Sequence, residues 1–159
     1  MSNIKNINEL AEIRKELKLQ NKMVVFTNGV FDILHAGHVD YLTKAKSKGD
    51  ILIVAVNSDL SVKKIKGELR PIVHQNERAF IISSLKPVDY VVIFDEETPY
   101  EIIKNIMPDV LVKGSDWSVE NIVGRDIVEA TGGKVESIEF TNDSSTTNII
   151  KTVLERFKK

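Results

Sequence analysis

Short runs of apolar residues alternate along this chain with stretches whose apolar positions recur at helical spacing. The runs predict strands at 23–28, 51–56, 90–94, 109–113 and 134–140. Helical spacing predicts helices over 6–18, 37–48, 75–85, 99–106, 120–130 and 145–157. The strands are nearly continuous apolar runs, which indicates burial on both faces and hence a parallel sheet covered by helices. We therefore expect a doubly wound, Rossmann-like α/β fold with five parallel strands.

The 159 residues suit one domain with a substantial core, and no linker or low-complexity segment interrupts the alternation. We expect a single domain over 1–159. It would consist of an N-terminal helix within 1–21, a core over 22–151 and a C-terminal helix over 145–157.

Composition excludes several classes of function. The net charge of −1 gives no basic field for nucleic acid, and the absence of cysteine excludes disulfides and thiolate chemistry. The longest strongly apolar run, Ile51 to Val56, is far too short to span a bilayer, and the polar N-terminus does not resemble a signal peptide. We expect a cytoplasmic protein with no membrane or nucleic-acid partner.

Polar loops follow four of the five predicted strands, over 28–38, 57–59, 113–117 and 142–147. In doubly wound sheets, ligands bind outside the carboxyl ends of the strands. The four loops therefore predict a ligand site on one rim of the sheet.

The first of these loops contains His35 and His38, which lie three residues apart at the predicted start of a helix. That spacing places both imidazoles on one side of the helix, beside unpaired backbone N–H groups that favour an anion. A phosphoryl site is favoured over simple capping and packing, and no third ligand at the usual spacing supports a metal. Gly29 would supply a positive φ or let a ligand approach the backbone, and Asp32 would cap the turn or hold a base or ribose.

The stretch Asn28-Gly-Val-Phe-Asp32 followed by His35-x-Gly-His38 resembles the signature of the His-x-Gly-His nucleotidyltransferase superfamily, which has the cytidylyltransferase-like fold. Further stretches resemble the heptose 1-phosphate adenylyltransferases, namely Thr27 to Val39, Arg70-Pro71, Val112 to Asp116 and Ser145 to Lys151. The chain departs from that pattern at Ser115-Asp116-Trp117, where the family more often has Gly-Asp-Tyr. In many bacteria this domain is fused to a sugar kinase.

This resemblance implies transfer of AMP from ATP to D-glycero-β-D-manno-heptose 1-phosphate, which gives ADP-heptose and pyrophosphate for lipopolysaccharide or surface-glycan synthesis. It also implies Mg²⁺ with the triphosphate, held mostly by phosphates and water, and a homo-oligomer. The alternatives are a sibling enzyme (a glycerol-3-phosphate or ethanolamine-phosphate cytidylyltransferase, or an FAD synthetase) and a nucleotide-binding regulatory module without turnover.

The resemblance also assigns residues. His35 and His38 would donate hydrogen bonds to the α-phosphate, and alignment with cytidylyltransferases favours Lys46 over Lys44 as the catalytic cation. The nucleotide would contact Asn28, Gly29, Val30, Phe31, Asp32, Gly37, Lys113, Gly114, Asp116, Ser145, Thr146 and Thr147. The second substrate would contact Asn57, Asp59, Lys63, Arg70, Arg78 and Trp117.

Several of these residues have a plain structural alternative. Lys63, Lys64, Lys66 and Arg70 form a basic loop that is either a flexible exposed segment or a flap over phosphates. Arg78 would contact phosphate or pair with Glu77 or Asp89, and Lys44 and Lys46 would otherwise lie on a solvated helix face. Ser144 to Thr147 would cap the last helix or bind the β- and γ-phosphates. Trp117 would stack on a ligand or pack, and His74 is expected at the surface.

Overall fold

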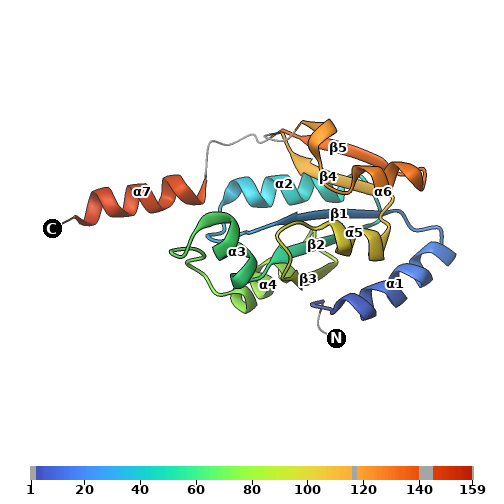
Figure 1. Cartoon of the computed structure of the whole chain (residues 1–159), viewed down its shortest axis with the longest axis horizontal. Coiled ribbons are helices and arrows are strands. Elements are labelled where there is room, and N and C mark those ends of the chain that lie inside the picture. Colours follow the sequence, from blue (N-terminus) through green and yellow to red (C-terminus); the bar gives the residue numbers. More distant parts are fainter. Residues whose placement is uncertain (1–2, 116–117, 140–144, 159) are drawn as a thin grey trace.

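Five parallel strands form the centre of the molecule (Figure 1). The computed structural model describes residues 3–115, 118–139 and 145–158. Its strands are β1 (Val24–Gly29), β2 (Ile51–Asn57), β3 (Tyr90–Phe94), β4 (Val110–Gly114) and β5 (Lys134–Ile138). Their spatial order is β3-β2-β1-β4-β5, and every neighbouring pair is parallel. The predicted doubly wound sheet is confirmed, and the strand bounds agree with the expected ones to within two residues.

The helices are α1 (Ile7–Leu19), α2 (Ala36–Lys46), α3 (Asp59–Lys66), α4 (Gln75–Ser83), α5 (Tyr100–Ile106), α6 (Arg125–Ala130) and α7 (Thr146–Phe157). The prediction of one helix over 120–130 was wrong. A 3₁₀ turn, η1 (Val119–Asn121), is separated from α6 by Gly124, which has a φ of 88°.

The prediction of a basic loop after the second strand was also wrong, because residues 59–66 form α3. The Ser58 side chain accepts a hydrogen bond from the Ser61 N–H and so caps the start of this helix. Gly67, with a φ of 93°, ends it. The lysines of this segment therefore lie on a helix with both ends defined.

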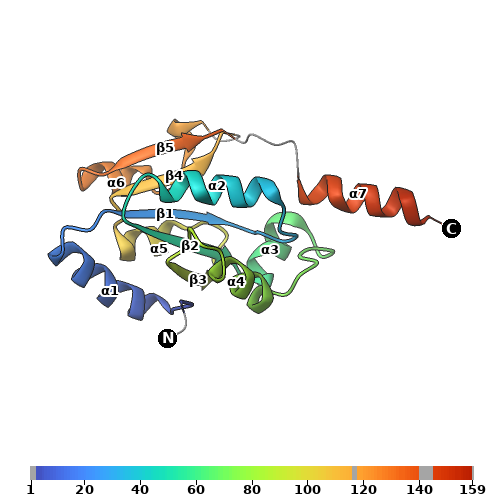
Figure 2. The ribbon, with the colours of Figure 1, turned by 180° about the vertical axis from the view of Figure 1, so that it is seen from behind.

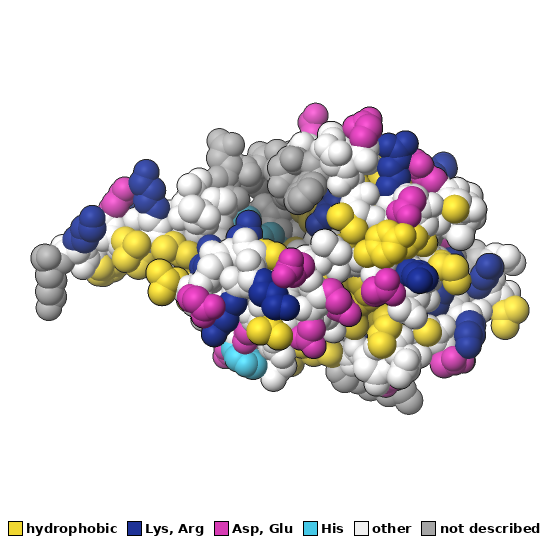
Figure 3. Space-filling model, viewed as in Figure 1, with side chains coloured by type: hydrophobic (Ala, Val, Ile, Leu, Met, Phe, Trp, Pro, Cys, Tyr) yellow, Lys and Arg dark blue, Asp and Glu magenta, His cyan; other side chains and the backbone are white. Residues whose placement is uncertain are grey.

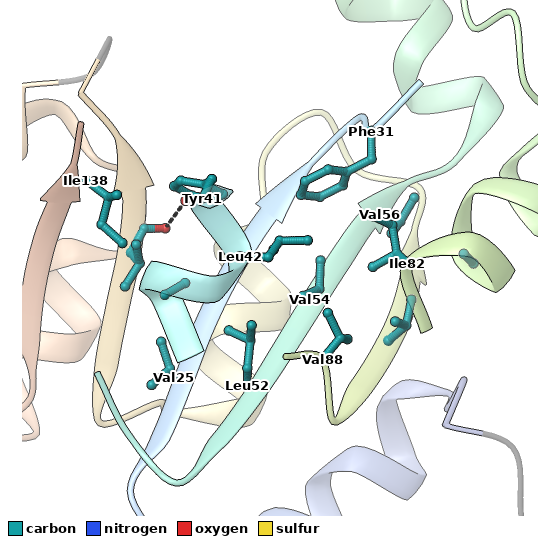
Figure 4. Packing of buried hydrophobic residues seen from close by; sticks show 14 of the residues in the cluster. Val25, Phe31, Tyr41, Leu42, Leu52, Val54, Val56, Ile82, Val88 and Ile138 are labelled. Atoms are coloured by element: carbon teal, nitrogen blue, oxygen red, sulfur yellow. Dashed lines mark hydrogen bonds between the residues drawn. The ribbon is translucent and has the colours of Figure 1, made fainter. Parts of the chain in front are cut away.

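Buried side chains fill both faces of the sheet, as the apolar runs predict. Successive residues of β2 point to opposite faces: Leu52 and Val54 join one cluster, while Ile53 and Ala55 join the other. Helices α2 and α4 cover the first cluster, part of which is drawn in Figure 4, and α1, α5 and α6 cover the second. This sandwich directs the carboxyl ends of all five strands toward the same rim.

The last helix, α7, extends away from the sheet beyond this rim (Figures 1 and 2). None of its described residues is buried, and Val153, Leu154 and Phe157 leave at least half of their surface exposed. Figure 3 shows hydrophobic side chains along one side of it. Within the described ranges, no helix combines the length and the apolar character needed to cross a bilayer.

Candidate active site at the start of helix α2

Two stacked imidazoles mark the carboxyl end of β1. His35 is the N-cap of α2 in an extended conformation and makes no side-chain capping bond, while His38 lies in the first turn. Their ring centroids are 3.8 Å apart, with the ring planes 25° from parallel. The edge of Phe31, whose centroid is 5.2 Å away, meets the His38 ring. The expected pairing of the two imidazoles on one side of the helix is confirmed.

Both imidazoles are neutral near pH 7. Burial, reinforced by the nearby His35, lowers the pKa of His38 to about 4, and burial also lowers the pKa of His35. The Nδ1 atoms of both rings are buried without a hydrogen-bond partner among the described residues. Since Nδ1 is buried in each ring, we assign the contact with a ligand to the other ring nitrogen, Nε2. A neutral imidazole protonated there donates one hydrogen bond.

The turn after β1 is shaped by close packing. Gly29 does not have a positive φ, so that expectation is corrected; a Cβ there would lie 2.9 Å from the Phe31 ring. Phe31 itself has the left-handed conformation, with a φ of 49°, which is unusual for a bulky residue. Gly29 therefore makes room for a strained Phe31, whose ring in turn contacts His38. Backbone strain of this kind clusters at functional sites.

Asn28 and Lys113 meet beside this turn, where β1 and β4 separate. The Lys113 Nζ donates to the Asn28 carbonyl over 3.2 Å. The Asn28 Oδ1 is buried and has no hydrogen-bond partner among the described residues. Since an unpaired buried oxygen is costly, this atom is a candidate contact for a ligand donor. Gly37 and Gly114, both buried, lie on the same rim.

The carboxylate of Asp32 is buried and is bound by other groups of the protein. Its Oδ1 accepts the N–H groups of Ile72 and Val73, and its Oδ2 accepts Nε of Arg70 over 2.6 Å. Burial opposes ionisation, but the two amides and the guanidinium outweigh it and lower the pKa of Asp32. The structure therefore corrects its expected role: Asp32 holds the segment 70–73 against the β1–α2 turn. Through Asp32, Arg70 is brought to the turn that carries the histidines.

Arg78 is enclosed by the protein, and its side chain has no exposed surface. Its guanidinium donates to the carbonyls of Val30 and Val73 and to the Asp59 carboxylate, the last over 2.8 Å. Neither Glu77 nor Asp89 is its partner. The prediction of substrate contact is corrected, because every Arg78 nitrogen serves the protein and joins α4 to the β1–α2 turn.

The residues predicted after the second strand have mixed positions. Asn57 is buried and donates to the Ser61 hydroxyl, and Asp59 pairs with Arg78 and with Nε2 of the exposed His74. Both side chains are thus engaged by the protein, and their contact with a substrate stays a prediction. Lys63 is exposed on α3, with Nζ 3.8 Å from the Glu68 carboxylate. The contact between Lys63 and a phosphate stays a prediction.

Lys46 is not brought to the histidines, which corrects its predicted catalytic role. It is the last residue of α2, and its ammonium binds the Asp89 carboxylate and the Asp50 carbonyl, just before β3 and β2 begin. It therefore lies at the amino ends of the strands. Lys44 instead pairs with Asp40 and donates to the Glu139 carbonyl.

The start of α7 reaches the β1–α2 turn. Thr146 donates through its hydroxyl to the Ile33 carbonyl over 3.3 Å. Ser145 caps the helix by accepting the Asn148 N–H, so its capping alternative is confirmed, and Thr147 is exposed. Of the other predicted contacts, Asp116, Trp117 and Ser144 lie outside the described residues.

Comparison with known proteins bears on what this site does. The family model for cytidylyltransferase-like proteins matches residues 26–152. A bifunctional protein HldE of Citrifermentans bemidjiense is 51% identical over 98% of this chain, and that of Aliarcobacter butzleri is 52% identical over 99%. The chain spans about a third of the length of these relatives (32% of each).

Solved structures share the architecture. A lipopolysaccharide core biosynthesis protein of Thermoplasma volcanium is 31% identical, with a TM-score of 0.63 over 77% of this chain and 99% of that one. A pantoate-beta-alanine ligase of Francisella tularensis, 18% identical, has a TM-score of 0.67 over 92% of this chain and 72% of its own, which shows the fold alone. With the family model covering most of the sequence, the chain belongs to the cytidylyltransferase-like family.

Proposed function

We propose that this chain is a nucleotidyltransferase that transfers AMP from ATP to D-glycero-β-D-manno-heptose 1-phosphate, giving ADP-heptose and pyrophosphate. The observation that carries the proposal is the pair of stacked, neutral imidazoles at the N-terminus of α2, whose Nδ1 atoms are buried, which leaves Nε2 for a ligand. Identity near 50% to bifunctional HldE proteins and likeness to a lipopolysaccharide core biosynthesis protein support the sugar-phosphate substrate.

The chemistry needs positioning more than proton transfer. An oxygen of the sugar 1-phosphate attacks the α-phosphorus of ATP and forms a new O–P bond, while the bond to the β-phosphate oxygen breaks and pyrophosphate leaves. The attacking phosphate is already ionised near neutral pH, so no general base is required. The protein must hold two polyanions together and stabilise charge on the α-phosphate.

The residues on the rim fit this task. The Nε2–H groups of His35 and His38 would donate to the α-phosphate oxygens, assisted by the positive end of α2. Lys113 and Arg70 lie next to the β1–α2 turn and would offset the charge of the phosphates. Thr146 and the first N–H groups of α7 would bind the β- and γ-phosphates.

Mg²⁺ belongs to this proposal as the usual partner of ATP. Within the described part of the chain, no group of three or more histidine, aspartate or glutamate residues is placed to hold a metal ion. We therefore expect any Mg²⁺ to be held mainly by phosphates and water, and no step depends on a protein-bound ion. Self-association and a cytoplasmic location remain part of the same proposal.

A substrate panel tests this function. The chain is incubated with Mg²⁺, one nucleoside triphosphate and one candidate phosphate at a time, and released pyrophosphate is measured. Release with ATP and the heptose phosphate supports the proposal. Preference for CTP with glycerol 3-phosphate would reassign the chain to a sibling enzyme, and binding without any release would indicate a regulatory module. The variant His35→Ala/His38→Ala, prepared identically, controls for contaminating activity.

A further inference from the structure

A cavity lies at the amino ends of the strands, on the opposite rim from the histidines. Its volume is about 690 Å³. The lining comes from α1, the links between α1 and β1 and between α2 and β2, the end of α5, the start of β4 and the segment from the end of α6 into β5. Cavities between 300 and 1,000 Å³ are typical of small-molecule sites. Neither the proposed reaction nor the histidine pair makes use of this cavity.

Positive charge dominates the lining. Its cationic side chains are Arg14, Lys15, Lys18, Lys22, Lys48 and Lys134, and its carboxylates are Asp109 and Glu136. The cavity therefore has an excess of four positive charges in a chain whose net charge is −1. A concave surface with charge of one sign concentrates ligands of the opposite sign.

Both carboxylates of the lining are already engaged. Asp109 binds Arg14 over 2.8 Å and also accepts the Val24 N–H, and Glu136 binds Lys48 over 2.6 Å. Lys15 pairs with Glu12, which is outside the cavity lining. Within the described ranges, Lys18, Lys22 and Lys134 have no ion-pair or hydrogen-bond partner for their ammonium groups. These lysines supply charge that the protein itself does not neutralise.

Arg14 adds a more rigid donor to the lining of the cavity. Its side chain is 11% exposed, and Nε and Nη2 are held by the Met107 carbonyl and by Asp109. Its third nitrogen, Nη1, has no hydrogen-bond partner among the residues that the structure describes. A guanidinium held in this way is preorganised to donate to an anion.

Helix dipoles explain only part of this charge. Lys18 lies in the last turn of α1, where a cation compensates the negative helix end. Lys22 precedes β1, and Lys134 begins β5, so neither is in a helix. Stabilisation of a helix end therefore does not explain why Lys22 and Lys134 line the same cavity.

We propose that this cavity binds a small polyanion, a molecule that carries two or more phosphate or carboxylate groups. Lys18, Lys22 and Lys134 would neutralise the charges of the ligand, and Arg14 would donate a hydrogen bond to it through Nη1. The dimensions favour a small molecule over a nucleic acid, which would need an extended basic surface rather than a cavity of this size. This site is separate from the proposed transferase site and does not depend on the transferase activity.

The test is a titration followed by amide NMR, with inorganic tripolyphosphate and citrate as separate probes. Saturable shifts are expected at the amides of Lys22, Gly132 and Gly133, which line the cavity. Replacing the lysines, as Lys18→Gln/Lys22→Gln/Lys134→Gln, should weaken this binding about tenfold, since three exposed charge contacts are lost. The two probes distinguish phosphate from carboxylate ligands.

The matched control, Lys86→Gln/Lys104→Gln/Lys158→Gln, removes the same charge from exposed positions outside the cavity. It should keep the wild-type affinity at the cavity amides. The proposal is overturned if neither probe gives saturable shifts there, or if both triple variants weaken binding equally. Shifts at Gly37 and His38 report the histidine site separately, so failure at the cavity is distinguishable from failure of the transferase proposal.

Discussion

The two rims of this sheet differ in how far the protein satisfies the hydrogen-bonding groups of their polar side chains. At the amino ends, three carboxylates accept backbone N–H groups at or just before the strand starts: Asp50 from Met23, Asp109 from Val24 and Asp89 from Leu52. At the carboxyl ends, the buried Nδ1 atoms of the histidine pair and the Asn28 Oδ1 lack described partners. Polar groups that the protein itself satisfies are structural, and a cluster of unsatisfied ones marks the carboxyl-end rim as the place for a ligand.

The largest expected effect concerns Arg78, which donates to the β1–α2 turn that carries the histidines. Arg78→Met should lower the free energy of unfolding by about 3–5 kcal/mol, because it leaves the Asp59 charge and the Val30 and Val73 carbonyls without their donor. Urea unfolding measures this change. Arg125→Met, which removes only an exposed pair with Glu129, should cost less than about 1 kcal/mol. Equal costs for the two variants would show that Arg78 does not hold the turn.

The next effect tests the histidines themselves. His38→Asn should slow nucleotidyl transfer about a hundredfold or more, because a preorganised donor to the developing charge is worth roughly 2.7–4 kcal/mol. Steady-state pyrophosphate release at saturating ATP provides the measurement. His74→Asn is the matched control, since that residue caps α4 and lies at the surface. A rate equal to that of the control would contradict a role for His38 on the reacting phosphate.

A third effect is the pH dependence of stability. The folded protein keeps His38 neutral down to about pH 4, whereas the unfolded chain binds a proton near its usual pKa of 6.5. The stability that the neutral His38 contributes is thus fully present above pH 6.5. It is lost as the pH falls toward 4, and the loss is at most about 3 kcal/mol. In His38→Gln this loss is absent, so urea midpoints at pH 7 and pH 5 should lie closer together than in the wild type. If the variant and the wild type show the same difference between these midpoints, the pKa of His38 is not lowered in the folded protein.

The smallest effect concerns the opposite rim. Lys46→Met should leave the transfer rate unchanged and cost about 1 kcal/mol or less in stability, because it removes a partly exposed pair with Asp89. Pyrophosphate release and urea unfolding on the same preparation measure both quantities. A tenfold loss of rate in a folded variant would return Lys46 to the catalytic residues.

The sheet could be predicted from sequence because burial on both faces imposes continuous apolar runs, as at Ile51 to Val56. Helix α3 was missed because its residues are mostly polar, and only Val62 and Ser61 are buried. Its ends had a readable signal, since Ser58 precedes it and Gly67 follows it. The many lysines of that segment are typical of an exposed loop, and they led to the prediction of a loop despite these capping residues.

The rim itself could be predicted from topology, but the partners of each side chain could not. The structural roles of Asp32 and Arg78 depend on contacts with residues far away in the sequence, which no local pattern encodes. Lys46 is different, because helix geometry already argued against it. Eight residues separate it from His38, which at 1.5 Å per residue is about 12 Å along the helix axis. Resemblance to relatives suggested the residue, and this distance excluded it.

The central claim is that the two imidazoles hold the reacting triphosphate, and histidine NMR tests it most directly. The ring resonances of His35 and His38 are titrated with pH in the absence and presence of saturating ATP. Because the phosphates favour the protonated form, the pKa of His38 should rise by at least about one unit from its value near 4, and both rings should shift. If ATP binds while both rings keep their pKa values and resonances, the triphosphate lies elsewhere and the claim is wrong.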